Sequence, residues 1–216
     1  MQNVLITGPS VEPVSVSDAI SHLRLGGVDL PDSETTLLGS LITAARTFFE
    51  NKTKLAVISQ TWRLTFNQIP RDGNNEGWWD GVREGSISEL SSESKRFIEL
   101  PTGPLISVTS FKAYAEDDTS STFTDYLVQT SLRPGRVALR NGSVWPIATR
   151  GVGNFEIDYV AGFGTAASEV PGDITLAIKQ LVAFYYENRE AMATEALSDL
   201  PMATRNIIRS RSVIRL

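Results

Sequence analysis

The chain has 216 residues, 41% hydrophobic content and a formal net charge of −5, an ordinary globular composition that argues against a protein that wraps nucleic acid. It contains no cysteine, so disulfides, cysteine-ligated metal centres and thiol nucleophiles are excluded. Residues 201–216 hold four arginines and no acidic side chain, which leaves the rest of the chain strongly acidic. An acidic body with a basic tail indicates two surfaces with different partners.

The first 55 residues predict two helices. Ser15 and Asp18 have the spacing of a capping box, and they open a short amphipathic helix that ends at the glycine pair 26–27. A second helix has its cap at 32–33 and continues to about Lys52, because its apolar residues recur at helical spacing.

The period of the sequence changes from helical to alternating after Leu55, which predicts an antiparallel β region over residues 56–167. A long loop at 71–95, rich in glycine, asparagine, serine and glutamate, separates its first two strands. Trp78 and Trp79 in this loop have two interpretations: they fold back onto the sheet, or they contact a partner. Six strands are expected, around residues 62–66, 96–100, 105–114, 126–129, 136–140 and 155–160.

The most apolar long segment is 170–190, which predicts a buried helix that begins near Pro171. Its apolar surface runs nearly all the way round, so either the helix is enclosed by its own chain or one face contacts another subunit. Its charged residues exclude a membrane span. The side chains assigned to this core or subunit packing are Ile174, Ile178, Leu181 and Tyr185.

The order of helices, then strands, then a helix indicates an α+β fold rather than an alternating parallel sheet. We expect a helical layer from both chain ends, 1–55 plus 168–200, that forms a helical connector core. The antiparallel β sandwich or barrel of residues 56–167 is inserted between the two halves of this layer. Residues 201–216 then form a separate basic tail.

Three candidate chemical sites lack the parts that their chemistry requires. Residues 162–167 match a G-x-G-x-x-A nucleotide pattern, but the following helix begins too late for its amides to receive a pyrophosphate. His22 is the only histidine, and apart from Asp18 no residue is spaced to join it in a catalytic or metal site. The carboxylates at 116–118 are typical of a solvated turn. We therefore expect no enzymatic activity, no cofactor and no metal.

The tail from Thr204 to Leu216 alternates arginine with isoleucine and valine. This pattern fits a short amphipathic strand, a helix or a disordered end. Three roles stay open: docking on a protein partner, which the mixed composition favours, packing within the chain, and contact with DNA phosphates. The residues assigned to partner binding are Arg205, Ile207, Ile208, Arg209, Arg211, Ile214 and Arg215.

A series of motifs, in order along most of the chain, resembles the head-tail connector, or adaptor, proteins of long-tailed bacteriophages, prophages and gene transfer agents. The loop at 71–95 looks longer than this family needs. The motifs that carry the resemblance are VEPVSVSDAISHLRL, the apolar helix ending near Phe49, SQTWRLTF, PLISVTSF, the pair Trp145 and Pro146, YVAGFG and VPGDITLAIKQLVAFYYENRE.

The resemblance implies a structural role in the virion neck, reached after assembly in the host cytoplasm and without a membrane. Subunits of this family form a ring, expected to be dodecameric, below the portal protein. The ring extends the DNA channel, through which DNA passes without specific binding, and docks the next neck or tail protein, such as a stopper. The family's helices pack between neighbours, and its C-terminal segment, here Thr204–Leu216, reaches the portal.

Two alternatives to the adaptor role remain open from the sequence. The first is a stopper or another tail-completion protein, which the motifs separate poorly from an adaptor. The second is a ligand-binding β module with helical flanks, for carbohydrate, in which Trp78 and Trp79 form the stacking platform.

Overall fold

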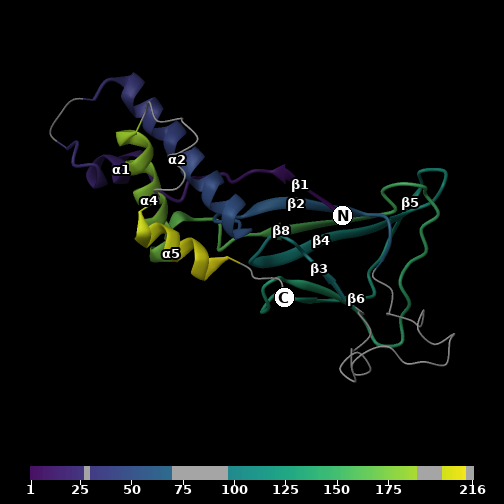
Figure 1. Cartoon of the computed structure of the whole chain (residues 1–216). Helices are drawn as coiled ribbons and strands as arrows, with labels where there is room; N and C mark the ends of the chain where they lie inside the picture. Colours follow the sequence, from purple (N-terminus) through teal and green to yellow (C-terminus); the bar gives the residue numbers. More distant parts are fainter. Residues whose placement is uncertain (27–29, 70–96, 189–200, 213–216) are drawn as a thin grey trace, which may run out of the picture.

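The computed structural model describes residues 1–26, 30–69, 97–188 and 201–212. Figure 1 shows the helices gathered at one end of the molecule and the strands extending away from them. The helices come from the parts of the chain on both sides of the main strand-forming region, and all pairings between the named strands are antiparallel. The predicted α+β class is therefore confirmed.

The helical layer is built around α4. This helix packs on the three other α-helices of the described chain, and its apolar side chains form the first hydrophobic core together with those of α1 and α2. The last part of the chain therefore returns to the first part, as the sequence predicts for a layer made from both ends. The four helices are α1 (Val16–His22), α2 (Asp32–Thr53), α4 (Gly172–Glu187) and α5 (Met202–Arg211).

The predicted capping box at the start of α1 is present. The Ser15 hydroxyl accepts a hydrogen bond from the Asp18 N–H at 3.1 Å and donates one to the Asp18 carboxylate at 2.7 Å. The helix ends at His22, ahead of the glycines, because Arg24 takes the left-handed conformation with φ 58°. The predicted side-chain cap of α2 is wrong: Pro31 is its N-cap and makes no capping bond, and its fixed φ is already suited to a helix start.

Two antiparallel sheets form the rest of the molecule, and side chains from both contribute to a second hydrophobic core. Both strand orders have free ends, so the described residues form two open sheets and not a closed barrel. The five-stranded sheet has the order β1 (Gln2–Thr7), β2 (Gln60–Phe66), β8 (Phe155–Ala161), β4 (Leu105–Tyr114), β5 (Ser120–Thr122). The three-stranded sheet has the order β3 (Phe97–Glu99), β7 (Arg136–Leu139), β6 (Tyr126–Gln129).

Two strands differ from the sequence prediction. Residues 1–55 were expected to be helical, but Gln2–Thr7 forms the edge strand β1, which pairs with β2. Its side chains are mostly exposed, so the run lacks the alternation that marks a half-buried strand. The short strand β5 was not among the six expected strands, and its three residues are exposed.

The glycines of the G-x-G-x-x-A pattern serve packing. Gly162 has φ 150°, and a Cβ there would lie 2.6 Å from the Ser59 backbone nitrogen. The Ser59 N–H donates to the Gly164 carbonyl at 2.8 Å. The absence of a side chain therefore lets the connection from β8 to α4 lie against the residues just before β2.

A buried charge cluster joins the helical layer to the sheets. Arg46 of α2 donates to Glu12 at 2.8 Å and to Glu50 at 2.8 Å, and its side chain is 9% exposed. The Glu50 carboxylate also accepts from the Val57 N–H at 2.9 Å and from Gln60 of β2 at 2.6 Å. Burial raises the pKa of Glu50 above its ordinary value. This cluster ties the N-terminal segment, α2 and β2 to one another.

Candidate assembly surfaces

The apolar helix α4 is enclosed by its own chain. Ile174, Ile178 and Leu181 are fully buried in the first core, and Tyr185 is half-buried against it. Of the two interpretations of this segment, enclosure by its own chain is therefore the correct one for these side chains. On the outer side of the helix, Leu176 is 45% exposed.

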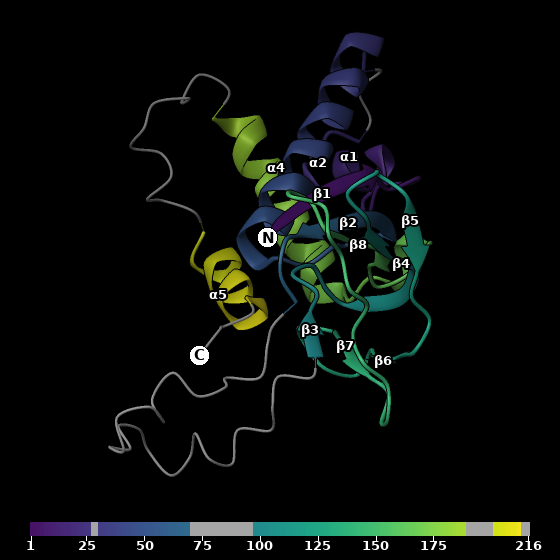
Figure 2. The same ribbon diagram turned by 90° about the vertical axis from the view of Figure 1, so that its right-hand side faces the viewer.

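The tail forms a helix that docks on the same chain. Thr204 is fully buried, and its hydroxyl donates to the Gln180 side chain at 2.6 Å. At the other end of α5, Arg211 binds the Asp173 carboxylate at 2.7 Å. Figure 2 shows α5 lying beside the lower half of α4. Of the three conformations left open by the sequence, residues 202–211 adopt the helix.

Because α5 docks on the same chain, some of the side chains assigned to partner binding are buried and others stay exposed. Ile207 and Ile208 pack against the first core, and Arg211 makes the ion pair with Asp173. Arg209 is exposed, and Arg205 is half-buried. Ile214 and Arg215 lie outside the described residues. The exposed side of α5 therefore presents Arg209 together with Met202 and small or polar residues, while its isoleucines stabilise the fold.

The outer face of the five-stranded sheet carries a network of paired charged and polar side chains. Arg63 makes two hydrogen bonds to Asp158, at 2.7 and 2.9 Å, and lies 3.5 Å from Glu156. Tyr114 donates to Glu156 at 2.8 Å, and Ser110 donates to Asp158 at 3.2 Å. The hydrogen bonds from Arg63 hold the pKa of Asp158 below its ordinary value. This face is polar but leaves no isolated cluster of one charge.

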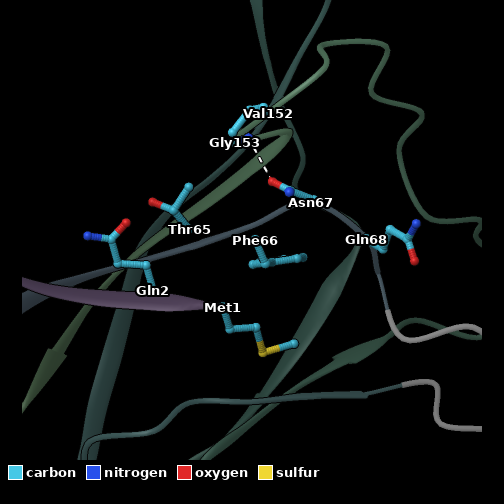
Figure 3. Close-up of a pocket in the computed structure, with 8 residues that line it drawn as sticks. All are labelled: Met1, Gln2, Thr65, Phe66, Asn67, Gln68, Val152 and Gly153. Carbon is cyan, nitrogen blue, oxygen red and sulfur yellow. Dashed lines mark hydrogen bonds between the residues drawn. The ribbon is translucent and has the colours of Figure 1, made fainter.

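An open recess of about 570 Å³ lies at the end of the sheet beside the N-terminus (Figure 3). Its rim is fixed by a 2.8 Å hydrogen bond from the Gly153 N–H to the Asn67 side chain. None of the lining side chains is an acid, a histidine or a cysteine, so the recess lacks the side chains that most often act in acid–base catalysis. The lining residues are Met1, Gln2, Thr65, Phe66, Asn67, Gln68, Val152 and Gly153.

The connection between β7 and β8 displays apolar side chains that sequence reasoning missed. Val144, Ile147 and Val152 are 82%, 88% and 73% exposed. Trp145, between two of them, packs against the second core and lies 6.0 Å from the Phe111 ring. Isolated branched residues in a glycine-containing loop give only a weak signal in the sequence. Whether such a side chain faces the solvent depends on which of its neighbours packs into the core.

The structure places the other candidate residues of the described chain at the surface. His22 is exposed, Asp118 of the acidic turn pairs with Arg150 at 3.0 Å, and no group of acidic or histidine side chains there could hold a metal. No helix in the same residues has the length and hydropathy to cross a membrane. Trp78 and Trp79 lie outside the described residues, so both of their interpretations stay predictions.

Comparison with solved structures shows where this fold occurs. A chain from the neck of an empty gene transfer agent particle, computed with C6 symmetry, is 24% identical with a TM-score of 0.76, and the match covers 100% of this chain and 97% of that one. A chain from the virion of a native gene transfer agent particle gives the same values. A neck chain of the native particle, computed with C12 symmetry, is 21% identical with a TM-score of 0.68 and the same coverage.

These matches establish a shared fold over the whole chain. No protein-family model and no curated protein matches the sequence.

Proposed function

We propose that this protein is a structural component of the neck of a tailed-phage-like particle, an adaptor whose copies form a ring between the portal and the next neck protein. The observation that supports this is the shared fold across the whole chain with neck chains of gene transfer agent particles, two of which were computed with C6 and C12 symmetry. A dodecameric ring is compatible with both symmetries. Its work is association, with no bond made or broken.

The charge distribution supports a channel through which DNA passes without binding. The body of the chain is acidic, and a field of that sign repels phosphates. Two of the described cations on or beside the outer sheet face, Arg63 and Arg150, are paired with carboxylates. Paired cations bind phosphate weakly because binding would have to break the existing ion pairs.

The tail is the proposed portal contact, but fewer of its residues are assigned to that contact than in the sequence analysis. Ile207 and Ile208 stabilise the helical layer, so removal of residues 204–216 would uncover the first core. The portal contact is therefore assigned to Arg209 and to the last four residues, 213–216. The docked helix α5 ends at Arg211, so these last residues follow directly on the part of the tail that packs on the helical layer.

The test is electron microscopy of the protein mixed with its cognate portal protein. We expect a ring of density on the portal, and loss of that ring when residues 213–216 are deleted and Arg209 is changed to Glu. Met202→Glu, at an exposed position of the same helix, is the matched control and should bind. A stopper would instead fail to bind the bare portal and would require a preformed adaptor ring.

A further inference from the structure

The β region has free edges that differ sharply in how they are protected. Exposed sheet edges are ordinarily protected by charges, proline, short length or covering segments, because their unpaired N–H and C=O groups attract other strands. Two of the four edge strands follow this rule. β5 has three residues, and β3 has three residues and carries Glu99, which pairs with Arg136 at 3.0 Å.

The other two edge strands, β1 and the four-residue β6, have no charge, proline or covering strand among the described residues. Gln2–Thr7 and Tyr126–Gln129 contain no charge and no proline. β1 has one irregularity, between Leu5 and Thr7, and is otherwise regular. Large aliphatic side chains on or beside these strands are 38–51% exposed. They are Val4, Leu5 and Ile6 at the first edge, and Leu127, Val128 and Leu132 at the second.

β1 is also held rigidly in place. The Asn3 side chain donates to Thr102 at 2.9 Å and accepts from the buried Tyr159 hydroxyl at 3.0 Å. The strand therefore cannot shift to hide its apolar side chains without breaking both hydrogen bonds. A fixed, uncharged and apolar edge is a preformed site for strand addition.

The two unprotected edges lie on opposite sides of the β region. In both Figure 1 and Figure 2, β2, β8 and β4 lie between β1 and β6. When two different surfaces on opposite sides of one chain bind each other, they produce head-to-tail association, which closes into a ring when the rotation between copies allows it. A single self-complementary edge would instead produce a two-fold dimer.

We propose that β1 of one copy pairs with β6 of the next copy around the ring, so that the five-stranded sheet of each subunit continues into the three-stranded sheet of its neighbour. The inference rests on the proposed neck ring and names the contact between its subunits. A pairing of four to six residues buries well under the roughly 1,200 Å² of total area typical of stable, specific complexes. Free subunits therefore associate weakly, and the ring closes on the portal.

Cross-linking tests the pairing directly, because the chain has no native cysteine. The double variant Leu5→Cys with Leu127→Cys, bound to the portal and treated with a short bismaleimide, should give a ladder of covalent oligomers up to the closed ring on a denaturing gel. The matched single variants should give no ladder. Dimers from Leu5→Cys alone would show two-fold pairing of β1 and overturn the proposal.

Substituting charged residues at the same exposed positions tests the strand pairing in a second, independent way. Leu5→Lys combined with Leu127→Lys should lower ring formation on the portal about tenfold, since like charges would face each other across the pairing. Leu5→Lys combined with Leu127→Glu should restore it. Ile147→Lys, at an exposed position outside both edges, should assemble normally.

The outcomes separate this inference from the proposed function. A ring on the portal without cross-links, and unaffected by the paired lysines, would overturn the strand pairing and leave the neck role intact. Absence of any wild-type ring on the portal would overturn both.

Discussion

The helical layer and the β region differ in how completely they bury their apolar side chains. Around α4 the chain returns to cover its own apolar helix, so Ile174, Ile178 and Leu181 contact only their own chain in the first core. The β region closes an equally well-buried core but leaves its edge strands β1 and β6 with exposed aliphatic side chains. The most apolar segment of a sequence is therefore the centre of the fold here, and the surfaces suited to association lie in its less apolar parts.

The largest expected effect concerns the charge cluster that joins the two regions. Arg46→Ala removes the cation that lies between Glu12 and Glu50. Breaking a buried ion pair in this way costs about 3–5 kcal/mol of unfolding free energy, because a carboxylate is left buried and unpaired. Urea unfolding followed by circular dichroism measures the loss. The double variant Arg46→Met with Glu50→Gln should recover much of it, and a loss below about 1 kcal/mol in Arg46→Ala would contradict the assignment.

The same cluster has a predictable pH dependence. Burial raises the pKa of Glu50 in the folded protein, so the neutral form is favoured by folding. That favourable contribution is complete below the pKa of the unfolded chain and is lost as pH rises through the folded pKa. Without Arg46 the ionised form of Glu50 is disfavoured further. The loss of unfolding free energy in Arg46→Ala should therefore be larger at pH 8 than at pH 5. A deficit independent of pH would show that Glu50 does not respond to this cation.

The next effect contrasts two leucines on opposite sides of α4. Leu181 is fully buried and Leu176 is 45% exposed. Leu181→Ala should cost about 2–5 kcal/mol by removing buried methyl groups and leaving a cavity, whereas Leu176→Ala should change stability by no more than about 0.5 kcal/mol. Thermal unfolding of the pair separates them. Equal effects would mean that the outer side of α4 is covered as well as the inner side.

A smaller effect is expected on the outer sheet face. The pKa of Asp158 is lowered by its hydrogen bonds from Arg63, so this group stabilises the fold above its unfolded pKa, and the contribution is lost as pH falls through the folded pKa. Asp158→Asn should cost about 1 kcal/mol at pH 7, and its stability should converge with that of the wild type in acid. Arg63→Ala should give a similar deficit at pH 7, and the two losses should not add.

Sequence reasoning located most elements because their signals are local. The strands β4 and β6 were predicted with the bounds that the structure gives, since both are bounded by clear turn residues. The capping box of α1 was found for the same reason: Ser15 and Asp18 are three residues apart, and their hydrogen bonds need no other part of the chain.

The features that the sequence did not reveal depend on distant partners. β1 is a strand because its backbone pairs with β2, more than fifty residues later, and no alternation marks its faces. Arg46 is buried because Glu12 and Glu50 converge on it, whereas in the sequence it is one charge on a helix. For Ile207 and Ile208 the sequence left packing within the chain open but favoured a partner, and the structure packs both against the first core. Composition alone does not distinguish an apolar residue that docks within the chain from one that docks outside it.

The smallest effect tests how firmly the tail belongs to the helical layer. Thr204→Val keeps the shape of the buried side chain but removes the donor to Gln180, whose oxygen is then left unpaired. The cost is about 1 kcal/mol, which corresponds to about fivefold faster amide hydrogen exchange in α5. The global unfolding midpoint should change little if α5 opens by itself, because local units open independently of the core. Asn206→Ala, on the exposed side of the same helix, should leave exchange unchanged. If Thr204→Val instead lowered the free energy of global unfolding by the same amount, about 1 kcal/mol, the tail would be an integral part of the helical core. Its end could then reach a portal only from this docked position.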